Sequence, residues 1–298
     1  MRAQLSSRDS KPPAMIVGKG MDGQTPPLGL DKAFRLGGGD RLGPGGIPHA
    51  IIHDHQPAFR AAIAAACGAC IEEDRGWFKC PPIVLIGRNT GRGHAARFLS
   101  QVAQLPHAVL SEVELLNCAT EAQQGPLGDN LWVSPVTLAM AVSRCANPIV
   151  TIKEADRLSS AASATMLAMV DPAAGQAWPE ERLRTWVDLS EVNWILRVED
   201  PAKLPHSLLR HAFVVEMAPS AWGANDFLQL SVTLEVLNDM GLRPTAAAQD
   251  SWAALGRGLR DPGDLYVAIR RALTDARGVY APSAGGQPQE QTGHLKGN

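Results

Sequence analysis

The sequence lacks an excess of charge of either sign, because 28 Lys and Arg residues face 30 Asp and Glu residues and give a formal net charge of −2. A chain so balanced has no global basic field, so binding to nucleic acid or to an anionic membrane is not expected. The sequence also lacks any run of about 18 apolar residues, the length that a membrane span needs. Residues 1–13 are polar, without the apolar core of a secretory signal. We therefore expect a cytoplasmic protein.

Cysteine is scarce and odd in number, with five residues in the chain: Cys67, Cys70, Cys80, Cys118 and Cys145. Such a set favours reduced thiols over a disulfide framework. The CxxC pair of Cys67 and Cys70 is followed by Cys80, but a zinc site needs four ligands and no fourth Cys or His stands at suitable spacing. Although His53 and His55 lie upstream, the Ala-rich surroundings predict small buried helical residues and no metal.

Regular structure is not expected at either end of the chain. Residues 1–47 are rich in Gly and Pro, and residues 281–298 are rich in Gly, Gln and Ser. Both segments bury too little apolar area to offset the entropy of ordering, so they are predicted to be disordered tails. Between them, residues 48–219 are predicted to form an α/β domain and residues 220–280 a small all-α lid. The lid rests on three helical patterns: Phe227–Met240, Thr245–Leu259 and Asp264–Ala276.

Short apolar runs alternate with helical patterns through the middle of the chain. Four runs have the character of buried strands, namely Pro82–Ile86, Asn147–Ile152, Val192–Val198 and Phe213–Met217, and a further strand is expected within Val109–Leu116. Helices are expected at Pro57–Glu73, Gly93–Gln104, Pro135–Cys145 and Ser159–Val170. Strands that alternate with helices favour a parallel sheet covered by helices on both faces.

A glycine-rich turn follows the first predicted strand and leads into a helix. Its side chains and backbone amides are candidate phosphate contacts: Gly87, Asn89, Thr90, Gly91, Arg92, Gly93 and His94. Glycines let backbone N–H groups curl around phosphate oxygens, and the helix N-terminus adds a favourable dipole. A working P-loop also needs a Lys for the phosphates and a Ser or Thr hydroxyl for magnesium. This turn has neither, so a strand-to-helix turn without a ligand is the alternative.

Three segments carry a resemblance to a known family. They are Ser163–Pro172 (SATMLAMVDP), Val187–Val192 (VDLSEV) and Leu204–Arg210 (LPHSLLR), preceded by Ala146–Val150 (ANPIV). In order and spacing they resemble the AAA+ ATPase module of the Lon-type proteases. The resemblance covers roughly the middle half of the chain. It implies a P-loop NTPase-like sheet followed by a helical lid, with ATP and magnesium as cofactors.

The resemblance also assigns roles, and the residues found there differ from the family pattern. Arg92 stands for the P-loop lysine and Gly93 for the hydroxyl residue. Lys153 and Glu154 stand for the Asp–Glu pair that ends the Walker B strand, so a cation replaces a magnesium ligand while the water-activating Glu154 remains. Glu199 replaces the sensor asparagine, which puts a carboxylate where a triphosphate should lie.

Two further positions follow from the same resemblance. The arginine-finger position falls on His211, with Arg210 one residue away and about 100° out of phase if the segment is helical. In the lid, Arg270 or Arg271 stands for a second sensor, although arginines on an exposed helix are more often solvated. The catalytic candidates are therefore Glu154, Arg210 and His211, and Lys153, Glu199 and Arg270 join the glycine-rich turn as nucleotide-binding candidates.

Two functions fit these residues. In the first, the protein is a pseudo-ATPase, a scaffold or regulator with weak or no ATP binding that joins protein partners or an AAA+-type homo- or hetero-oligomer. In the second, it is an atypical active AAA+ ATPase in which Arg92, Glu154 and Arg210 or His211 fulfil the lost roles. No protease activity is expected, because residues 221–298 are too few for the lid and a further domain. Trp178 and Trp222, in polar contexts, are predicted to face a partner.

Overall fold

A computed structural model of the chain describes residues 13–50, 57–87, 92–121 and 133–217, together with residues 267, 270 and 271. The chain divides into two compact units, Met1–Pro219 and Ser220–Asn298. The described elements all belong to the first unit, apart from the three isolated residues, which are helical. The predicted lid (220–280) and C-terminal tail (281–298) therefore lie almost wholly outside the described residues.

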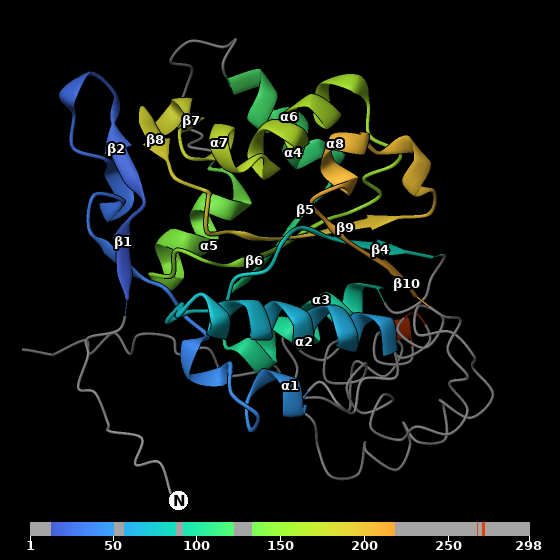
Figure 1. Cartoon of the computed structure of the whole chain (residues 1–298). Helices are drawn as coiled ribbons and strands as arrows, with labels where there is room; N and C mark the ends of the chain where they lie inside the picture. The colour runs from blue at the N-terminus through green and yellow to red at the C-terminus, as the bar shows by residue number, and fades with distance from the viewer. Residues whose placement is uncertain are drawn as a thin grey trace, which may run out of the picture. The chain divides into compact units, whose positions relative to one another are not determined.

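A five-stranded parallel sheet forms the centre of the first unit (Figure 1). Its strands, in their order across the sheet, are β10 (Phe213–Glu216), β4 (Ile83–Ile86), β9 (Asn193–Val198), β6 (Ile149–Ile152) and β5 (His107–Leu110). Each neighbouring pair runs parallel. The first strand of this sheet along the chain, β4, thus lies between the last two, and the fold is the P-loop NTPase-like arrangement that the sequence predicts.

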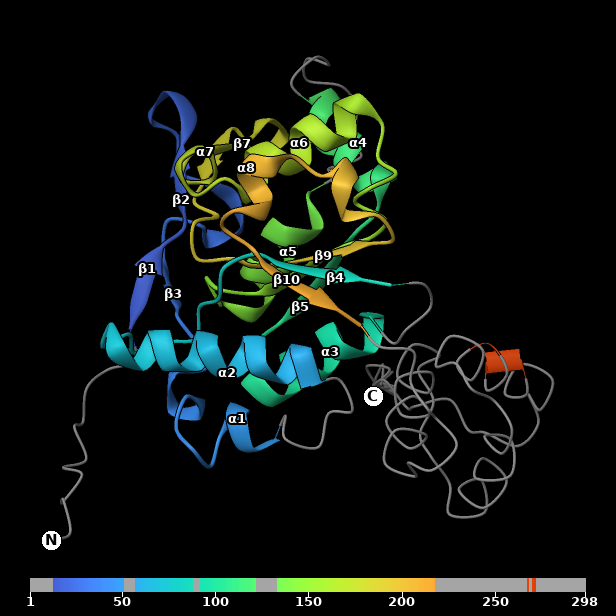
Figure 2. The ribbon, with the colours of Figure 1, turned by 45° about the vertical axis from the view of Figure 1, so that its right-hand side comes forward.

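Both faces of this sheet are buried, which explains the nearly continuous apolar runs of its strands. Along β9, Trp194, Leu196 and Val198 enter one core cluster and Ile195 enters the other, as the twofold period of a strand requires. One face is covered by α2 (Pro57–Glu72) and α3 (Arg92–Ala103). The opposite face is covered by α4 (Glu112–Glu121), α5 (Pro135–Ser143) and α6 (Ser160–Val170) (Figures 1 and 2). Shorter helices are α1 (Ile47–Ala50), α7 (Pro172–Gly175) and α8 (His206–Leu209). None of the described helices is long and apolar enough to cross a membrane.

Four predicted strands and four predicted helices are confirmed, but the prediction for Val109–Leu116 is wrong over most of its length. Strand β5 ends at Leu110, and α4 begins at Glu112. The chain turns here because the Glu114 carboxylate reaches back to the residue before α4, as in one half of a capping box, and accepts from the Ser111 amide at 2.8 Å and from its hydroxyl. The Ser-x-x-Glu pattern was a helix start signal inside an apolar run.

The N-terminal segment also differs from its prediction. Residues 13–47, expected to be disordered, form β1 (Ala14–Ile16), β2 (Gly18–Gly20) and β3 (Ala33–Arg35) and bury Val17, Leu30 and Phe34 in the core. Many of the glycines serve close packing. A Cβ added at Gly18 would collide with the Cβ of Leu30, and one added at Gly39 would collide with the carbonyl of Gly76. Their abundance therefore reflects close approaches of the backbone.

Long-range bonds fasten this segment to the rest of the unit. Strand β2 joins β8 (Thr185–Val187) and β7 (Trp178–Glu180) in a three-stranded antiparallel sheet, while β1 pairs with β3 (Figure 1). The buried side chain of Asn147 accepts from the Gly37 amide at 2.8 Å and donates to the carbonyls of Gly37 and Phe78 at 3.0 and 2.9 Å. The N-terminal segment is thus bonded to the amino end of the main sheet.

Glu180, at the end of β7, is a buried carboxyl held by two hydroxyls. It accepts hydrogen bonds from Ser134 and from Thr137, the latter at 2.5 Å, at the first turn of α5. Burial raises the pKa of the Glu180 carboxyl, although the two hydroxyls oppose the shift. The folded protein therefore keeps a proton on Glu180 at pH values where the unfolded chain has released it.

Replacing Glu180 with glutamine is expected to make the protein more stable than the wild type at neutral and alkaline pH. The stability that comes from the raised pKa is complete below the unfolded pKa of about 4.5 and declines as the pH rises, whereas Gln has no proton to lose and still accepts from both hydroxyls. Urea unfolding between about pH 5 and pH 8 measures the difference. The control is Glu181→Gln, one residue along. A stability difference between wild type and Glu180→Gln that does not change with pH would contradict this prediction.

Candidate functional site

The carboxyl ends of the parallel strands bring several predicted site residues to one edge of the sheet, here called the carboxyl edge. The Gly87 amide, after β4, donates to the Val198 carbonyl of β9 at 3.1 Å, so Gly87 lies beside Glu199. The Lys153 amide, after β6, donates to the Leu110 carbonyl of β5 at 2.9 Å. Open α/β sheets bind their ligands at this edge. The structure thus places Gly87, Lys153, Glu154 and Glu199 on the side where a nucleotide would bind.

The structure describes the two ends of the glycine-rich turn, at Gly87 and at the first turn of α3. Gly87 has φ of +140°, in a region that side chains rarely adopt. Helix α3 begins at Arg92, so the backbone of Arg92, Gly93 and His94 forms its first turn, where N–H groups and the helix dipole favour an anion. Residues 88–91, with the predicted contacts Asn89, Thr90 and Gly91, lie outside the described residues, as do the side chains of 92–94.

In the two loops that follow β6 and β9, carboxylates outnumber cations, and several of these groups are engaged within the chain. Glu199 forms an ion pair with Arg157 at 2.6 Å. The Asp156 carboxylate accepts from the backbone amides of Glu199 and Asp200 at 3.1 and 3.0 Å. With the exposed Glu154, residues 153–157 and 199–200 carry four carboxylates and two cations. These carboxylates would repel a triphosphate, whereas Arg88 and Arg92 of the glycine-rich turn, whose side chains lie outside the described residues, equal the excess of carboxylates in number.

The turn after β6 has an unusual backbone at the predicted catalytic base. Glu154 has φ of +49°, a left-handed conformation that costs energy in a residue other than glycine. Its carbonyl accepts from the Arg157 amide at 2.8 Å, which closes a tight turn between Lys153 and Arg157. This turn leaves Lys153 and Glu154 exposed to solvent.

The structure does not bring the arginine-finger candidates to the same edge. Arg210 and His211 lie between α8 and β10, at the amino end of a strand that pairs parallel with β4. Four strand residues span about 13 Å, so the two side chains lie across the sheet from Glu154. Arg270 belongs to the second unit, where it is helical and exposed. A catalytic role for any of these three stays a prediction.

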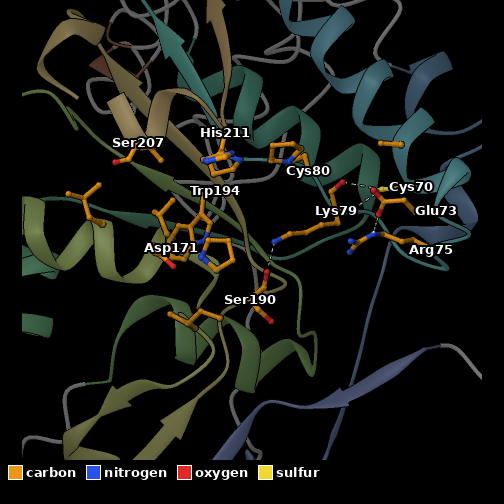
Figure 3. Close-up of a pocket in the computed structure, with 18 residues that line it drawn as sticks. Cys70, Glu73, Arg75, Lys79, Cys80, Asp171, Ser190, Trp194, Ser207 and His211 are labelled. Atoms are coloured by element: carbon orange, nitrogen blue, oxygen red, sulfur yellow. Dashed lines mark hydrogen bonds and ion pairs between the residues drawn. The ribbon is translucent and has the colours of Figure 1, made fainter. Parts of the chain in front are cut away.

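The amino ends of the strands border a cavity of about 690 Å³, here called the amino-edge pocket (Figure 3). Its lining comes from α2, from the segment before β4, from the α6–α7 junction, from the segment before β9 and from α8. Of the predicted site residues that the structure describes, His211 alone lines it. Sequence reasoning missed the pocket, because no single motif contains its scattered lining residues.

Lys79 is the most buried cation of the amino-edge pocket. Its ammonium donates to the carbonyls of Ser190 at 2.6 Å and Val192 at 2.8 Å, as Figure 3 shows for the former. Burial lowers the pKa of Lys79, against the opposing effect of the nearby Glu191 carboxylate. The Lys79 side chain therefore ties the segment before β9 to the segment before β4.

The sequence predicts that the cysteines are reduced thiols that bind no metal. All five cysteines are buried free thiols. Burial raises the pKa of Cys67 and Cys80 to about 12, which makes both thiols poor nucleophiles. Among the described residues, no three His, Cys, Asp or Glu side chains converge as metal ligands would.

Trp178, predicted to face a partner, is only 8% exposed because β7 packs it into the core, and that prediction is wrong. Trp222 lies outside the described residues.

Comparisons with known proteins add little to this geometry. No model of a known protein family matches the sequence, and no curated protein matches it significantly. Among solved structures, a RuvB mutant from Thermotoga maritima is similar at 13% identity and a TM-score of 0.39, covering 78% of this chain and 68% of that chain. A TM-score of this size carries no argument about function, so the function is argued from the residues themselves.

Proposed function

We propose that this protein is an AAA+-like scaffold, a pseudo-ATPase that keeps the nucleotide-binding type of fold and acts through protein partners without hydrolysing ATP. The observation that carries the proposal is the chemistry of the carboxyl edge. The position of the magnesium-binding acid holds Lys153, and the position of the sensor amide holds Glu199, which is paired with Arg157 at 2.6 Å.

The electrostatic argument is independent of any single substitution. A triphosphate bound with magnesium needs cations on its oxygens and at least one carboxylate on the metal. Here the ammonium of Lys153 would repel a magnesium ion at the metal position. The carboxylates of Glu199 and its neighbour Asp200 would repel the phosphates. The Arg157 guanidinium, which would attract phosphates, already serves Glu199. In the absence of a nucleotide, the guanidinium of Arg157 is thus engaged with Glu199.

The wild-type protein is therefore expected to show no binding of Mg-ATP at several millimolar nucleotide. A ligand at about 100 times its dissociation constant stabilises a protein by roughly 2.7 kcal/mol. For a domain of this size each kcal/mol raises the melting temperature by about 2–4 °C. Calorimetric titration measures the dissociation constant for Mg-ATP, and thermal unfolding with and without Mg-ATP measures the shift in melting temperature.

Release of phosphate from ATP is the outcome that would overturn the pseudo-ATPase proposal. The matched variant is Glu154→Gln, which removes only the candidate base. Hydrolysis by the wild type that disappears in Glu154→Gln would establish the alternative of an atypical active ATPase. Hydrolysis that is equal in both proteins would indicate a contaminating enzyme and leave the binding measurement to decide.

A further inference from the structure

The amino-edge pocket is separate from the predicted nucleotide position. It borders the amino ends of β4 and β9, whereas Glu154 and Glu199 follow the carboxyl ends of β6 and β9. Its volume of about 690 Å³ lies within the range of roughly 300–1,000 Å³ that is usual for sites of small molecules. A ligand of the amino-edge pocket would therefore bind whether or not the carboxyl edge binds ATP.

The walls of the pocket are largely apolar. Side chains from three separate elements supply them, including Trp194 from β9, Leu208 from α8, and Leu167 and Val170 from α6. Trp194 is only 3% exposed, so its ring is held firmly by the core behind it. An aromatic or aliphatic body would exchange water for these walls on binding.

Most of the charged groups that line the pocket are already engaged. Arg75 pairs with Glu73 at 2.5 Å and lies 5.7 Å from the ring centroid of Trp77. The Asp171 carboxylate accepts from the amides of Ala173 and Ala174 at the start of α7. Arg75 and Glu73 thus neutralise each other, and the Asp171 carboxylate is held by backbone amides.

Lys79 is the exception. An ammonium has three donors, and the carbonyls of Ser190 and Val192 take two of them. Within the described parts of the chain no carboxylate forms an ion pair with Lys79; Glu191 and Asp188 act on it only at longer range, and the Glu191 carboxylate accepts from Trp77 at 2.7 Å and lies 3.8 Å from Arg75. Buried charges are normally paired, and burial, which lowers the pKa of Lys79, makes its ammonium costly without a carboxylate in contact.

We propose that the amino-edge pocket binds a small amphipathic organic anion, whose apolar body packs against Trp194, Leu208 and Leu167 and whose acidic group pairs with the Lys79 ammonium. The acidic group supplies a counter-charge in direct contact with the ammonium, which no carboxylate of the described residues does. In Figure 3, the Lys79 side chain extends toward Ser190, and Trp194 lies on the same side of the pocket as Asp171. The apolar walls thus fit the apolar body of the ligand, and the Lys79 ammonium fits its acidic group.

The test uses two fluorescent probes that share an apolar body and differ in charge. Anilinonaphthalene sulfonate carries one sulfonate, and phenylnaphthylamine has the same aromatic rings without it. Fluorescence titration of the full-length protein is expected to give one site for each probe, with the sulfonate bound about tenfold more tightly, which corresponds to ~1.4 kcal/mol. The sulfonate should also raise the melting temperature, because a ligand of the native state stabilises it.

Two pairs of variants locate the site. Lys79→Gln keeps a donor for the Ser190 carbonyl but removes the charge, so it should abolish the preference for the sulfonate, while the exposed Lys203→Gln should retain it. Ala69→Trp places a large ring at the exposed rim of the pocket and should weaken both probes about tenfold or more. Ala61→Trp, two turns earlier on the solvent side of α2, should leave both unchanged.

Three results would overturn the proposal. The first is equal affinity of the wild type for the two probes, which would remove the role of Lys79 whether or not Lys79→Gln folds. The second is a sulfonate that lowers the melting temperature, since that indicates binding to unfolded chains. The third is unchanged binding in Ala69→Trp, which would place the probes elsewhere on the protein.

Discussion

Replacing Phe34 with alanine is expected to lower the free energy of unfolding by about 3–5 kcal/mol, as for other fully buried aromatic side chains. Phe34 lies on β3 with 0% exposure, and the Arg144 guanidinium lies 5.1 Å from its ring centroid. The cavity left by the ring would be bordered by core residues of the sheet domain. Thermal unfolding should report a fall of roughly 10 °C.

The matched control for Phe34→Ala is Lys19→Ala on the neighbouring strand β2. Lys19 is exposed, so its replacement should change stability by no more than about 0.5 kcal/mol. A loss below about 1 kcal/mol in Phe34→Ala would mean that the N-terminal segment does not pack against the sheet in solution. The composition-based prediction of disorder for residues 1–47 would then stand.

Restoring the family residues at the carboxyl edge is expected to create Mg-ATP binding. The variant combines Arg92→Lys, Gly93→Thr, Lys153→Asp and Glu199→Asn, which together supply the phosphate lysine, the magnesium hydroxyl, the magnesium carboxylate and the sensor amide. It also frees Arg157 from its ion pair with Glu199. We expect a gain in affinity of at least about tenfold over any residual binding of the wild type, measured by calorimetric titration.

A variant with the same changes except Gly93→Thr is the control for this experiment. Without the hydroxyl the magnesium shell is incomplete, so ATP binding should lose its dependence on magnesium. If the complete variant is folded and still binds no nucleotide, the carboxyl edge is not equivalent to the family's ATP site. The resemblance would then extend to the strands but not to the site.

The sheet could be predicted from the sequence because each of four strands has a recognisable local pattern of residues. Runs such as Ile83–Ile86 and Ile149–Ile152 are short, β-branched and apolar on both faces, which only a buried parallel sheet accommodates. The N-terminal strands gave no such signal. β2 is Gly18–Gly20, and its place depends on Val187, far away in the sequence, so composition alone pointed to disorder.

The candidate site, too, has a part that could be predicted from the sequence and a part that could not. Lys153, Glu154 and Glu199 could be placed together beforehand, since residues that follow parallel strands meet at one edge. The amino-edge pocket could not be foreseen, because Lys79, Asp171 and Leu208 meet there from distant segments. Nor could the Arg157–Glu199 ion pair, which joins two loops 42 residues apart and occupies the cation nearest to Glu199.

The pairing of β2 with β8 has a consequence for how the protein is made. Gly18 leaves the ribosome long before its partner Val187, and at about 5–20 residues per second the wait is on the order of ten seconds or more. During that time the N-terminal strand has no edge to join, so it is available to other nascent chains. A polypeptide that stops before residue 178 lacks β7 and β8, and it also lacks β9 and β10, the two neighbours of β4 in the main sheet, so such a product should aggregate. Expression of N-terminal fragments would therefore give insoluble protein even though the missing part is remote in sequence.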